Sequence, residues 1–347
     1  MRTRPITALH RITLAALVQL VFIGAVAAQV SETSPQLLDE ERQAVVLRIS
    51  ELLEQRYVYQ AVGEESGADL MARLQAGEFD DVSDPAAFAA RLTDALQDVS
   101  HDKHLRVRVR PPQRAQVERD DPARARAQAA TRAKARNYGF EKVERLEGNV
   151  GYVDMRYFDG SEEAKPTAAA AMNFLANADA IIFDMRQNGG GSPEMIRYVS
   201  SWFFGESTHL NSLYWRAGER TQEFWTYDDI PGVKRPDVPL FVLTSGRTFS
   251  GAEEFSYNML TQERATLIGE VTGGGANPGG TTTINERFEV FIPVGAAVNP
   301  ITGTNWEGVG VTPHLEVPAA EAFDIALEKA QAAAEAFRSE GSGSEQH

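Results

Sequence analysis

Ser250 is the residue whose surroundings most suggest chemistry. It follows an apolar segment, residues 238–245, and directly precedes residues 251–262, which are typical of a helix. A serine in this place can cap the helix, and Ser250 with Glu253 fits a capping box. It can also carry a nucleophile, because the first helical turn favours negative charge. This stretch alone supports both interpretations.

A glycine-rich loop ends another apolar segment. Residues 181–186 are followed by Gly189, Gly190 and Gly191. In an open α/β sheet, ligands bind beyond the carboxyl ends of the strands, where glycines let a backbone approach a substrate. The loops lack the residues of a P-loop and of G-x-G-x-x-G, which disfavours a phosphate site. If the two strands are neighbours, the glycine loop and the N–H of Gly251 could supply two oxyanion donors.

A serine nucleophile needs a base, and histidine is the first candidate. Of the six histidines, one lies near each end of the chain, in segments that we expect to lie outside the fold. The others are His101, His104, His209 and His314. A pair such as His101 and His104, three residues apart, could also ligate a metal. Because no second ligand cluster is evident, we predict neither a metal site nor a cofactor.

The composition and the amino terminus restrict where the chain works. Residues 1–28 combine a basic start, an apolar run too short to span a bilayer and small residues at a cleavage site. We interpret this segment as a cleaved secretory signal, with a retained anchor as the alternative, and expect a periplasmic or secreted protein without membrane insertion after cleavage. The net charge of −15 disfavours binding of nucleic acid. The absence of cysteine excludes disulfides and thiol chemistry.

The start of the mature chain is predicted to be a small helical bundle. Apolar residues recur at helical spacing in residues 35–57, 68–76 and 86–98. We therefore predict an N-terminal helical domain over residues 29–104.

The remainder predicts an α/β core. Residues 105–147 begin with the alternating sequence LRVRVRP, a strand with one basic face, and continue as a basic linker to which we assign no chemistry. In residues 148–320, strands alternate with helices, which indicates crossover units and a largely parallel sheet covered by helices. A helix and a polar, mobile tail close the chain in residues 321–347.

At this point a family resemblance can be stated. The chain resembles the carboxy-terminal-processing and tricorn-type serine peptidases, in particular the branch similar to interphotoreceptor retinoid-binding protein, through IIFDMRQNGGG, VLTSGRTFSGAEEF, RATLIGEVTGGGANPG and NWEGVGVTPHLEV. The resemblance runs through most of residues 100–318. It implies a crotonase-like α/β fold, Ser250 as the nucleophile, and peptides or unfolded proteins as substrates. Cores of this kind often associate, so a homo-oligomer is compatible with it.

The resemblance also implies the base. The carboxy-terminal-processing branch activates its serine with a lysine in T-F-G-K-G, whereas this chain has Gly275 at the lysine position. The tricorn-like branch uses a histidine near the start of the core and a late glutamate. The matching residues are His104 as general base and Glu307 as the residue that orients it.

Further implications concern the residues around the nucleophile. The tricorn pattern has a serine before its histidine, where this chain has Lys103; Ser100-His101 carries that dipeptide, so His101 is the alternative base. By its place in the motif, Gly190 is the second oxyanion donor beside Gly251. Residues 272–280 would form a mobile lip over the site.

Two other functions remain open. The resemblance includes a retinoid carrier, so the same fold could serve as a binding module for retinoids or fatty acids. A third hypothesis is a structural or partner-binding protein of the cell envelope. It depends only on the basic segment, residues 106–136. Residues 105–147 are also too short and too charged for the PDZ domain that carboxy-terminal-processing enzymes carry there.

Overall fold

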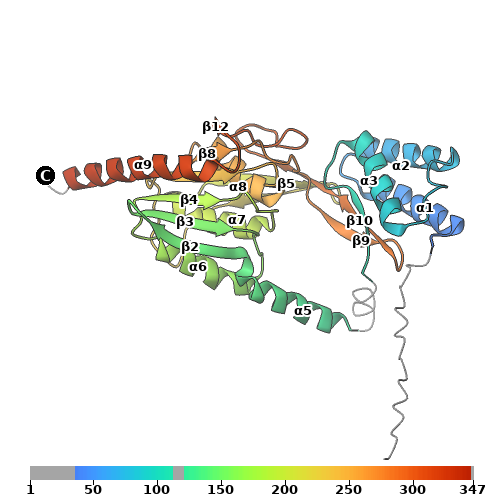
Figure 1. Cartoon of the computed structure of the whole chain (residues 1–347), viewed down its shortest axis with the longest axis horizontal. Coiled ribbons are helices and arrows are strands. Elements are labelled where there is room, and N and C mark those ends of the chain that lie inside the picture. Colours follow the sequence, from blue (N-terminus) through green and yellow to red (C-terminus); the bar gives the residue numbers. More distant parts are fainter. Residues whose placement is uncertain (1–35, 112–120, 345–347) are drawn as a thin grey trace, which may run out of the picture. The chain divides into compact units, whose positions relative to one another are not determined.

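A six-stranded sheet forms the core of the α/β part of the chain (Figure 1). The computed structural model describes residues 36–111 and 121–344, so the predicted signal segment, residues 1–28, lies outside the described residues. The strand order is β12-β8-β7-β4-β3-β2, and every neighbouring pair is parallel except β2 and β3. The strands are β2 (Phe140–Leu146), β3 (Val150–Met155), β4 (Ala180–Asp184), β7 (Leu240–Thr244), β8 (Thr266–Gly269) and β12 (Leu315–Glu316). The predicted parallel sheet is therefore confirmed.

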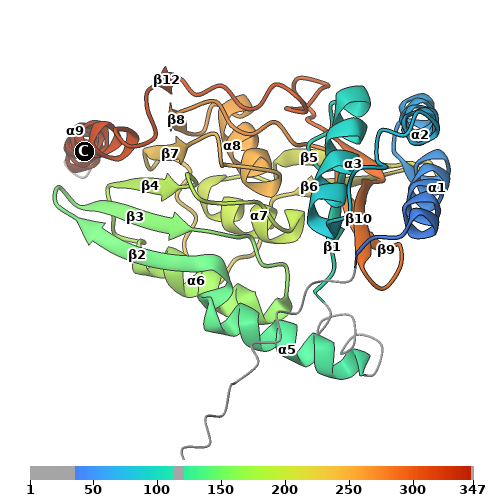
Figure 2. The same cartoon turned by 45° about the vertical axis from the view of Figure 1, so that its right-hand side comes forward.

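Helices cover both faces of this sheet (Figure 2). On one face lies α9 (Ala322–Ser344), whose alanines recur every four residues and pack on the strands. On the other face lie α6 (Lys165–Phe174), α7 (Pro193–Ser200) and α8 (Gly251–Thr261). Every residue of β4 and β7 is buried, as expected of parallel strands that are covered on both sides.

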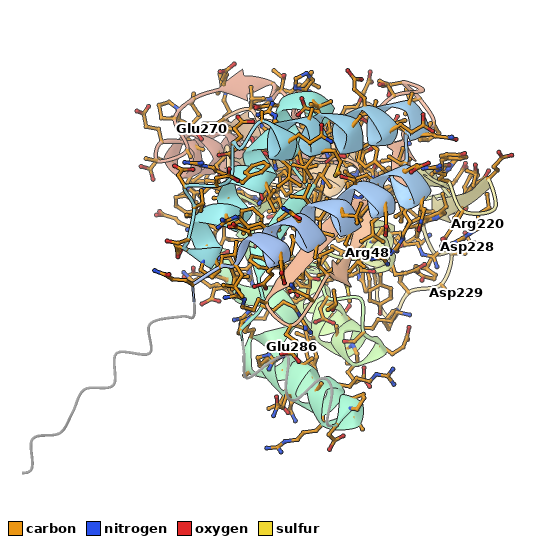
Figure 3. All side chains as sticks on the ribbon, turned by 90° about the vertical axis from the view of Figure 1, so that its right-hand side faces the viewer. Arg48, Arg220, Asp228, Asp229, Glu270 and Glu286 are labelled. Atoms are coloured by element: carbon orange, nitrogen blue, oxygen red, sulfur yellow. The ribbon has the colours of Figure 1, made fainter. Side chains whose placement is uncertain are left out.

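The N-terminal helices share their core with strands from the end of the chain. They are α1 (Asp39–Arg56), α2 (Gln60–Gln75) and α3 (Pro85–Ser100). On α1, Val45 and Ile49 are buried, whereas Arg48 lies on the exposed side (Figure 3). Phe88 of α3 packs edge-on against Phe288 at 5.7 Å between ring centroids. The helical domain is thus completed by a strand nearly two hundred residues further along the chain.

That strand belongs to one of two smaller antiparallel sheets. The first has the order β1-β10-β9, with β1 (Arg106–Val109), β9 (Gly279–Thr283) and β10 (Phe288–Pro293). The second has the order β11-β5-β6, with β5 (His209–Trp215), β6 (Arg220–Trp225) and β11 (Gly295–Val298). Because β10 and β11 are separated by a single residue, the two small sheets are directly connected.

The structure differs from the sequence prediction between residues 105 and 147. The central sheet begins earlier than expected, because β2 lies in this segment and pairs with β3 from Phe140 onward. The basic part forms α5 (Pro122–Ala135), none of whose residues is buried. The described residues also contain three short 3₁₀ helices: Asn137–Gly139, Glu162–Ala164 and Ser201–Phe203. In the described part of the chain, no helix is both long enough and apolar enough to cross a bilayer.

Candidate active site

Ser250 occupies a strained turn between β7 and α8. Its backbone has φ 56° and ψ −123°, a left-handed conformation that costs a non-glycine residue about 1–3 kcal/mol. The turn is fixed from below, because Thr248 Oγ1 donates to the Met185 carbonyl at 2.9 Å. A sharp strand–turn–helix connection of this kind exposes a serine side chain above the sheet.

Ser250 and Glu253 form the capping box that the sequence predicts at the start of α8. The backbone N–H of Ser250 donates to Glu253 Oε2 at 2.8 Å. The Glu253 backbone N–H donates to the Ser250 carbonyl at 2.8 Å, so it does not depend on the Ser250 hydroxyl alone for an acceptor. The cap is therefore compatible with a hydroxyl that turns toward a ligand.

The glycine loop after β4 lies directly against this turn. β4 and β7 are paired neighbours, which meets the condition that the sequence left open. A Cβ added to Gly190 would lie 2.7 Å from Gly251 N and 2.8 Å from Ser250 Cβ. The two loops can approach this closely only because position 190 has no side chain.

The N–H of Gly190 has a partner of its own. It donates to Asn188 Oδ1 at 2.8 Å, and Asn188, which is fully buried, also donates to the Met155 carbonyl. The N–H of Gly191 makes no hydrogen bond within the described residues, and it lies 2.9 Å from the position of a Cβ added to Gly251. The family resemblance implies Gly190 as the second oxyanion donor. In this structure, however, the backbone N–H of Gly190 already donates to Asn188.

His104 lies between two aromatic rings at the mouth of the same site. Its ring stands 4.6 Å from Phe249 and 5.6 Å from Phe291, measured between centroids. Burial, and to a lesser degree the charge of Arg106, lowers the pKa of His104 to about 4. At neutral pH the imidazole is therefore uncharged and can accept a proton.

The alternative base, His101, lies elsewhere. It is the exposed C-cap residue of α3, with a left-handed φ of 56°, and it does not line the cleft that contains Ser250 and His104. Of the two histidines, only His104 shares the cleft with Ser250.

Glycine at position 275 makes room for the imidazole. A Cβ there would lie 2.4 Å from the Phe249 ring and 2.7 Å from His104 Cε1. Gly275 is the residue that matches the lysine of the carboxy-terminal-processing branch. A lysine side chain at this position would displace both rings. The site therefore has room for the His104 imidazole or for a lysine at position 275, but not for both.

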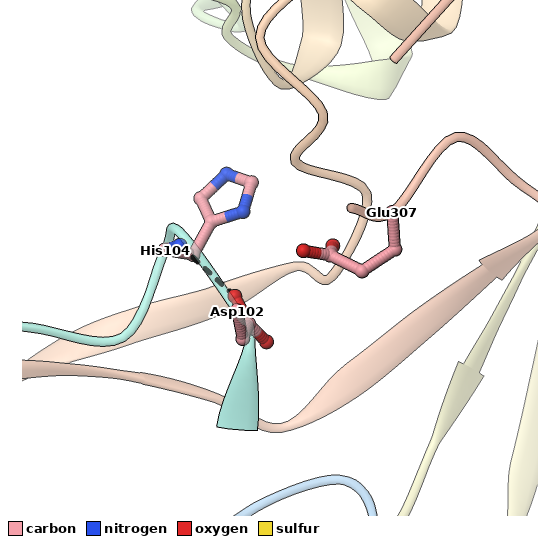
Figure 4. A group of neighbouring side chains, drawn as sticks. All are labelled: Asp102, His104 and Glu307. Atoms are coloured by element: carbon pink, nitrogen blue, oxygen red, sulfur yellow. Dashed lines mark hydrogen bonds between the residues drawn. The ribbon is translucent and has the colours of Figure 1, made fainter. Parts of the chain in front are cut away.

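Glu307 points toward His104 (Figure 4). One ligand atom from each of Asp102, His104 and Glu307 lies within 4.8 Å of the others. Glu307 Oε2 accepts hydrogen bonds from the backbone N–H groups of Ala276 (2.5 Å) and Asn277 (3.0 Å). Glu307 Oε1 and His104 Nδ1 are both buried without a hydrogen-bond partner among the described residues. Burial, and then repulsion from Asp102, raises the pKa of Glu307 to about 8.

Asp102 fixes the turn that carries His104. Its Oδ1 accepts from the His104 backbone N–H at 2.9 Å, and its Oδ2 accepts from Tyr57 and the Asn277 side chain, both at 2.9 Å. Burial raises the pKa of this carboxyl. Asp102, His104 and Glu307 offer two carboxyl groups and an imidazole, which are ligand types that can bind a metal cation. However, both oxygens of Asp102 and one of Glu307 already accept hydrogen bonds, which favours a role in positioning.

The loop of residues 272–280 is tied down rather than forming a free lip. Glu253 Oε1 accepts from Thr272 Oγ1 (2.5 Å) and Gly274 N (2.6 Å), and its Oε2 accepts from Gly275 N (2.9 Å). Lys103 donates to the Gly273 carbonyl. The expected mobile lip is therefore wrong for this part of the loop, because buried carboxylates satisfy its backbone N–H groups.

Ser250 and His104 open into one cleft of about 770 Å³. Its far wall is apolar and comes mainly from β5, β6 and β10. The wall residues are Leu213, Trp215, Phe224 and Phe291. Arg106 and Arg108 of β1 also line the cleft.

Two family models match the chain. The model described as peptidase family S41 matches residues 149–317. The model described as the N-terminal domain of peptidase S41 in eukaryotic IRBP matches residues 36–140. Between residues 36 and 317 the two models leave only eight residues, 141–148, unmatched.

Individual proteins agree with this assignment. A carboxy-terminal-processing protease of Bartonella bacilliformis is 22% identical over 179 residues, which are 50% of this chain and 40% of that protein. A carboxyl-terminal-processing protease of Synechocystis is 33% identical over 152 residues, which are 43% of this chain and 32% of that protein. The matches thus span less than half of either relative.

Among solved structures, the tricorn protease has a TM-score of 0.53 at 12% sequence identity. The superposition covers 86% of this chain and 37% of that one. At this identity the likeness concerns the fold alone, and it confirms the α/β architecture that the resemblance implied.

Proposed function

Because this chain belongs to peptidase family S41, we propose that it is a serine peptidase in which Ser250 is the nucleophile and His104 the general base. One observation carries this proposal: Ser250, at a strained backbone position, shares a cleft with an uncharged imidazole that occupies the space left by Gly275. A serine–lysine dyad does not fit that space.

The reaction follows from these positions. As Ser250 Oγ attacks the scissile carbonyl carbon, its proton passes to His104 Nε2, and an acyl-enzyme forms after the protonated imidazole returns the proton to the leaving amine. Water then repeats the attack and releases the second product. General-base catalysis of this type typically contributes about 10²- to 10⁴-fold in rate.

Glu307 acts through the histidine. A hydrogen bond from His104 Nδ1–H to Glu307 Oε1 would pair the two buried atoms that lack partners, and it would hold Nε2 toward Ser250. When it is ionised, Glu307 also stabilises the imidazolium that forms during attack. Glu307 is therefore a positioning residue.

The oxyanion requires two N–H donors. Gly251 N–H is at the first turn of α8, and Gly191 N–H is the neighbouring amide without a partner; we assign the oxyanion to these two. In known enzymes, removing one such donor costs about 2.7–4 kcal/mol of transition-state stabilisation. Gly190 contributes by allowing the loops to meet, and its own N–H keeps Asn188 in place.

Substrate class and location complete the proposal. The cleft would accept a peptide or an unfolded segment of a protein in extended form, without a cofactor. The composition of residues 1–28 favours export, so the peptidase would act in the periplasm or outside the cell.

A serine-reactive fluorophosphonate probe tests the proposal. We expect it to label the wild type and His101→Ala but not Ser250→Ala, and to label His104→Ala much more slowly. Equal labelling of wild type and Ser250→Ala would refute the nucleophile. Saturable binding of a fluorescent fatty acid or retinoid, with no cleavage of any peptide, would instead identify a carrier.

A further inference from the structure

Two arginines line the cleft beside the nucleophile. Arg106 and Arg108 alternate along β1, so both side chains lie on the same face of the strand. Both contribute to the walls of the cleft that contains Ser250 and His104. The guanidinium of Arg106 also lies 5.4 Å from the centre of the Phe249 ring.

Neither of these arginines forms an ion pair within the described residues, although the more distant Asp102 acts on Arg106 and partly opposes the lowering of its pKa. The next residue of the same face, Arg110, is different, because it is buried beside Glu289 with 3.7 Å between charged atoms. Arg106 is half-buried, and burial together with the charge of Arg108 lowers its pKa. Two neighbouring cations, one of them partly removed from water, are costly to leave without a counter-charge.

Among the described residues that line the cleft, Glu194 is the one acid, and it does not supply that counter-charge. Glu194 is paired with Arg197 at 2.6 Å and accepts a hydrogen bond from Tyr227. The β1 side of the cleft is therefore positive, in a chain with a net charge of −15. A local charge opposite to that of the whole molecule points to a ligand of negative charge.

We propose that Arg106 and Arg108 bind a carboxylate of the substrate and thereby select acidic peptides for cleavage. Arginine suits this role because its planar guanidinium can donate two parallel hydrogen bonds to one carboxylate. The carboxylate can belong to an aspartate or glutamate side chain or to the carboxyl terminus of the peptide. This inference rests on the proposed function, since it names the substrates of the same cleft.

A paired peptide library tests this selectivity. Each peptide with Glu or Asp has a counterpart with Gln or Asn, and each is made with a free and with an amidated carboxyl terminus. Mass spectrometry gives the ratio of kcat/KM within each pair. We expect the wild type to prefer the carboxylate member by about tenfold. The Glu/Gln pairs report a side-chain carboxylate, and the acid/amide pairs report the terminal one.

The variants then assign the preference to β1. In R106Q/R108Q the ratio should fall toward one, R106K/R108K should keep part of it, and R126Q should keep all of it. Arg126 is a suitable control because it is exposed on α5 and does not line the cleft. Ratios near one in the wild type, or a ratio unchanged in R106Q/R108Q, would overturn the proposal.

Binding separates this inference from the peptidase itself. Fluorescence anisotropy with Ser250→Ala measures the same peptide pairs without cleavage, and the acidic member should bind about tenfold more tightly. If the wild type is not labelled by the fluorophosphonate but this preference persists, the peptidase fails and the carboxylate site stands. If labelling occurs and the preference is missing, the peptidase stands and the carboxylate site fails.

Discussion

Glu253 Oε2 accepts the backbone N–H of Ser250 at 2.8 Å, so a buried glutamate helps to hold the start of α8. The same carboxylate accepts three hydrogen bonds from residues 272–275. The glutamate therefore joins the nucleophile to the loop that packs against His104. The helix cap and the proposed nucleophile therefore belong to the same motif.

The first prediction concerns this carboxylate. In Glu253→Gln, the amide group replaces one of two oxygens that together accept four hydrogen bonds, so buried donors lose their acceptor. We expect the free energy of unfolding, measured in urea, to fall by about 1–3 kcal/mol per unpaired donor. We also expect kcat to fall more than KM rises, because Ser250 and the loop beside His104 lose their common anchor. Glu328→Gln, exposed on α9, is the matched control and should change neither value. Wild-type stability in Glu253→Gln would contradict the anchoring role.

The second prediction follows from the backbone of Ser250. At φ 56°, glycine is relaxed whereas serine and alanine are strained. Ser250→Gly and Ser250→Ala should both be inactive, but Ser250→Gly should be more stable than Ser250→Ala by about 1–3 kcal/mol. Thermal or urea unfolding of the two proteins makes the comparison. Equal stabilities would show that this turn is unstrained.

Local patterns in the sequence predicted much of the fold. Ser250 and the glycines after β4 lie at strand ends that the alternation of strands and helices had placed at one edge of a parallel sheet. His104 and Glu307 came from the family motifs, since nothing in their local sequence distinguishes them from the other histidines and acids.

Other parts depend on contacts between distant segments, which periodicity does not reveal. Nothing in the local sequence distinguishes Asp102 from an exposed polar residue. It can be buried because the distant residues Tyr57 and Asn277 donate hydrogen bonds to it. The β5–β6 hairpin is mixed in composition and gains its apolar burial only against the core. Residues 272–280 read as a mobile glycine-rich loop, because the two glutamates that bind its N–H groups lie 19 or more residues away.

The third prediction tests the space beside the imidazole. In Gly275→Ala, the new methyl group would lie 2.4 Å from the Phe249 ring and 2.7 Å from His104 Cε1, so at least one ring must move. We expect kcat/KM to fall at least about tenfold, since a base must remain within hydrogen-bond reach of the nucleophile. Gly280→Ala is the matched control, because a Cβ there meets nothing within 4 Å. Full activity of Gly275→Ala would show that His104 need not occupy its present place.

The fourth prediction concerns metal ions. If Asp102, His104 and Glu307 hold and orient a base, catalysis needs no cation at this cluster. Dialysis against EDTA should leave kcat/KM unchanged, and addition of Zn²⁺ should not raise it above the untreated value. Loss of activity in EDTA that Zn²⁺ or Mn²⁺ restores would assign the cluster to a metal instead.

The fifth prediction is a pH dependence of stability that belongs to Glu307. Its pKa of about 8 in the folded protein lies above the ordinary value of 4.5, so the folded state keeps a proton that the unfolded state releases. The resulting stabilisation is complete below pH 4.5 and is lost as the pH rises through 8.

His104, whose pKa is lowered to about 4, affects stability in the opposite direction and only at acidic pH. Burial also raises the pKa of Glu254 to about 8, but Glu254 titrates in both proteins and its effect cancels in their comparison. Between pH 7 and 9 the wild type should therefore lose about 1.4 kcal/mol more stability than Glu307→Gln. Glutamine keeps an acceptor for Ala276 and Asn277 but does not ionise, which makes it the suitable comparison. Urea unfolding of both proteins at several pH values measures the difference, and parallel curves would mean that Glu307 is already ionised at pH 7.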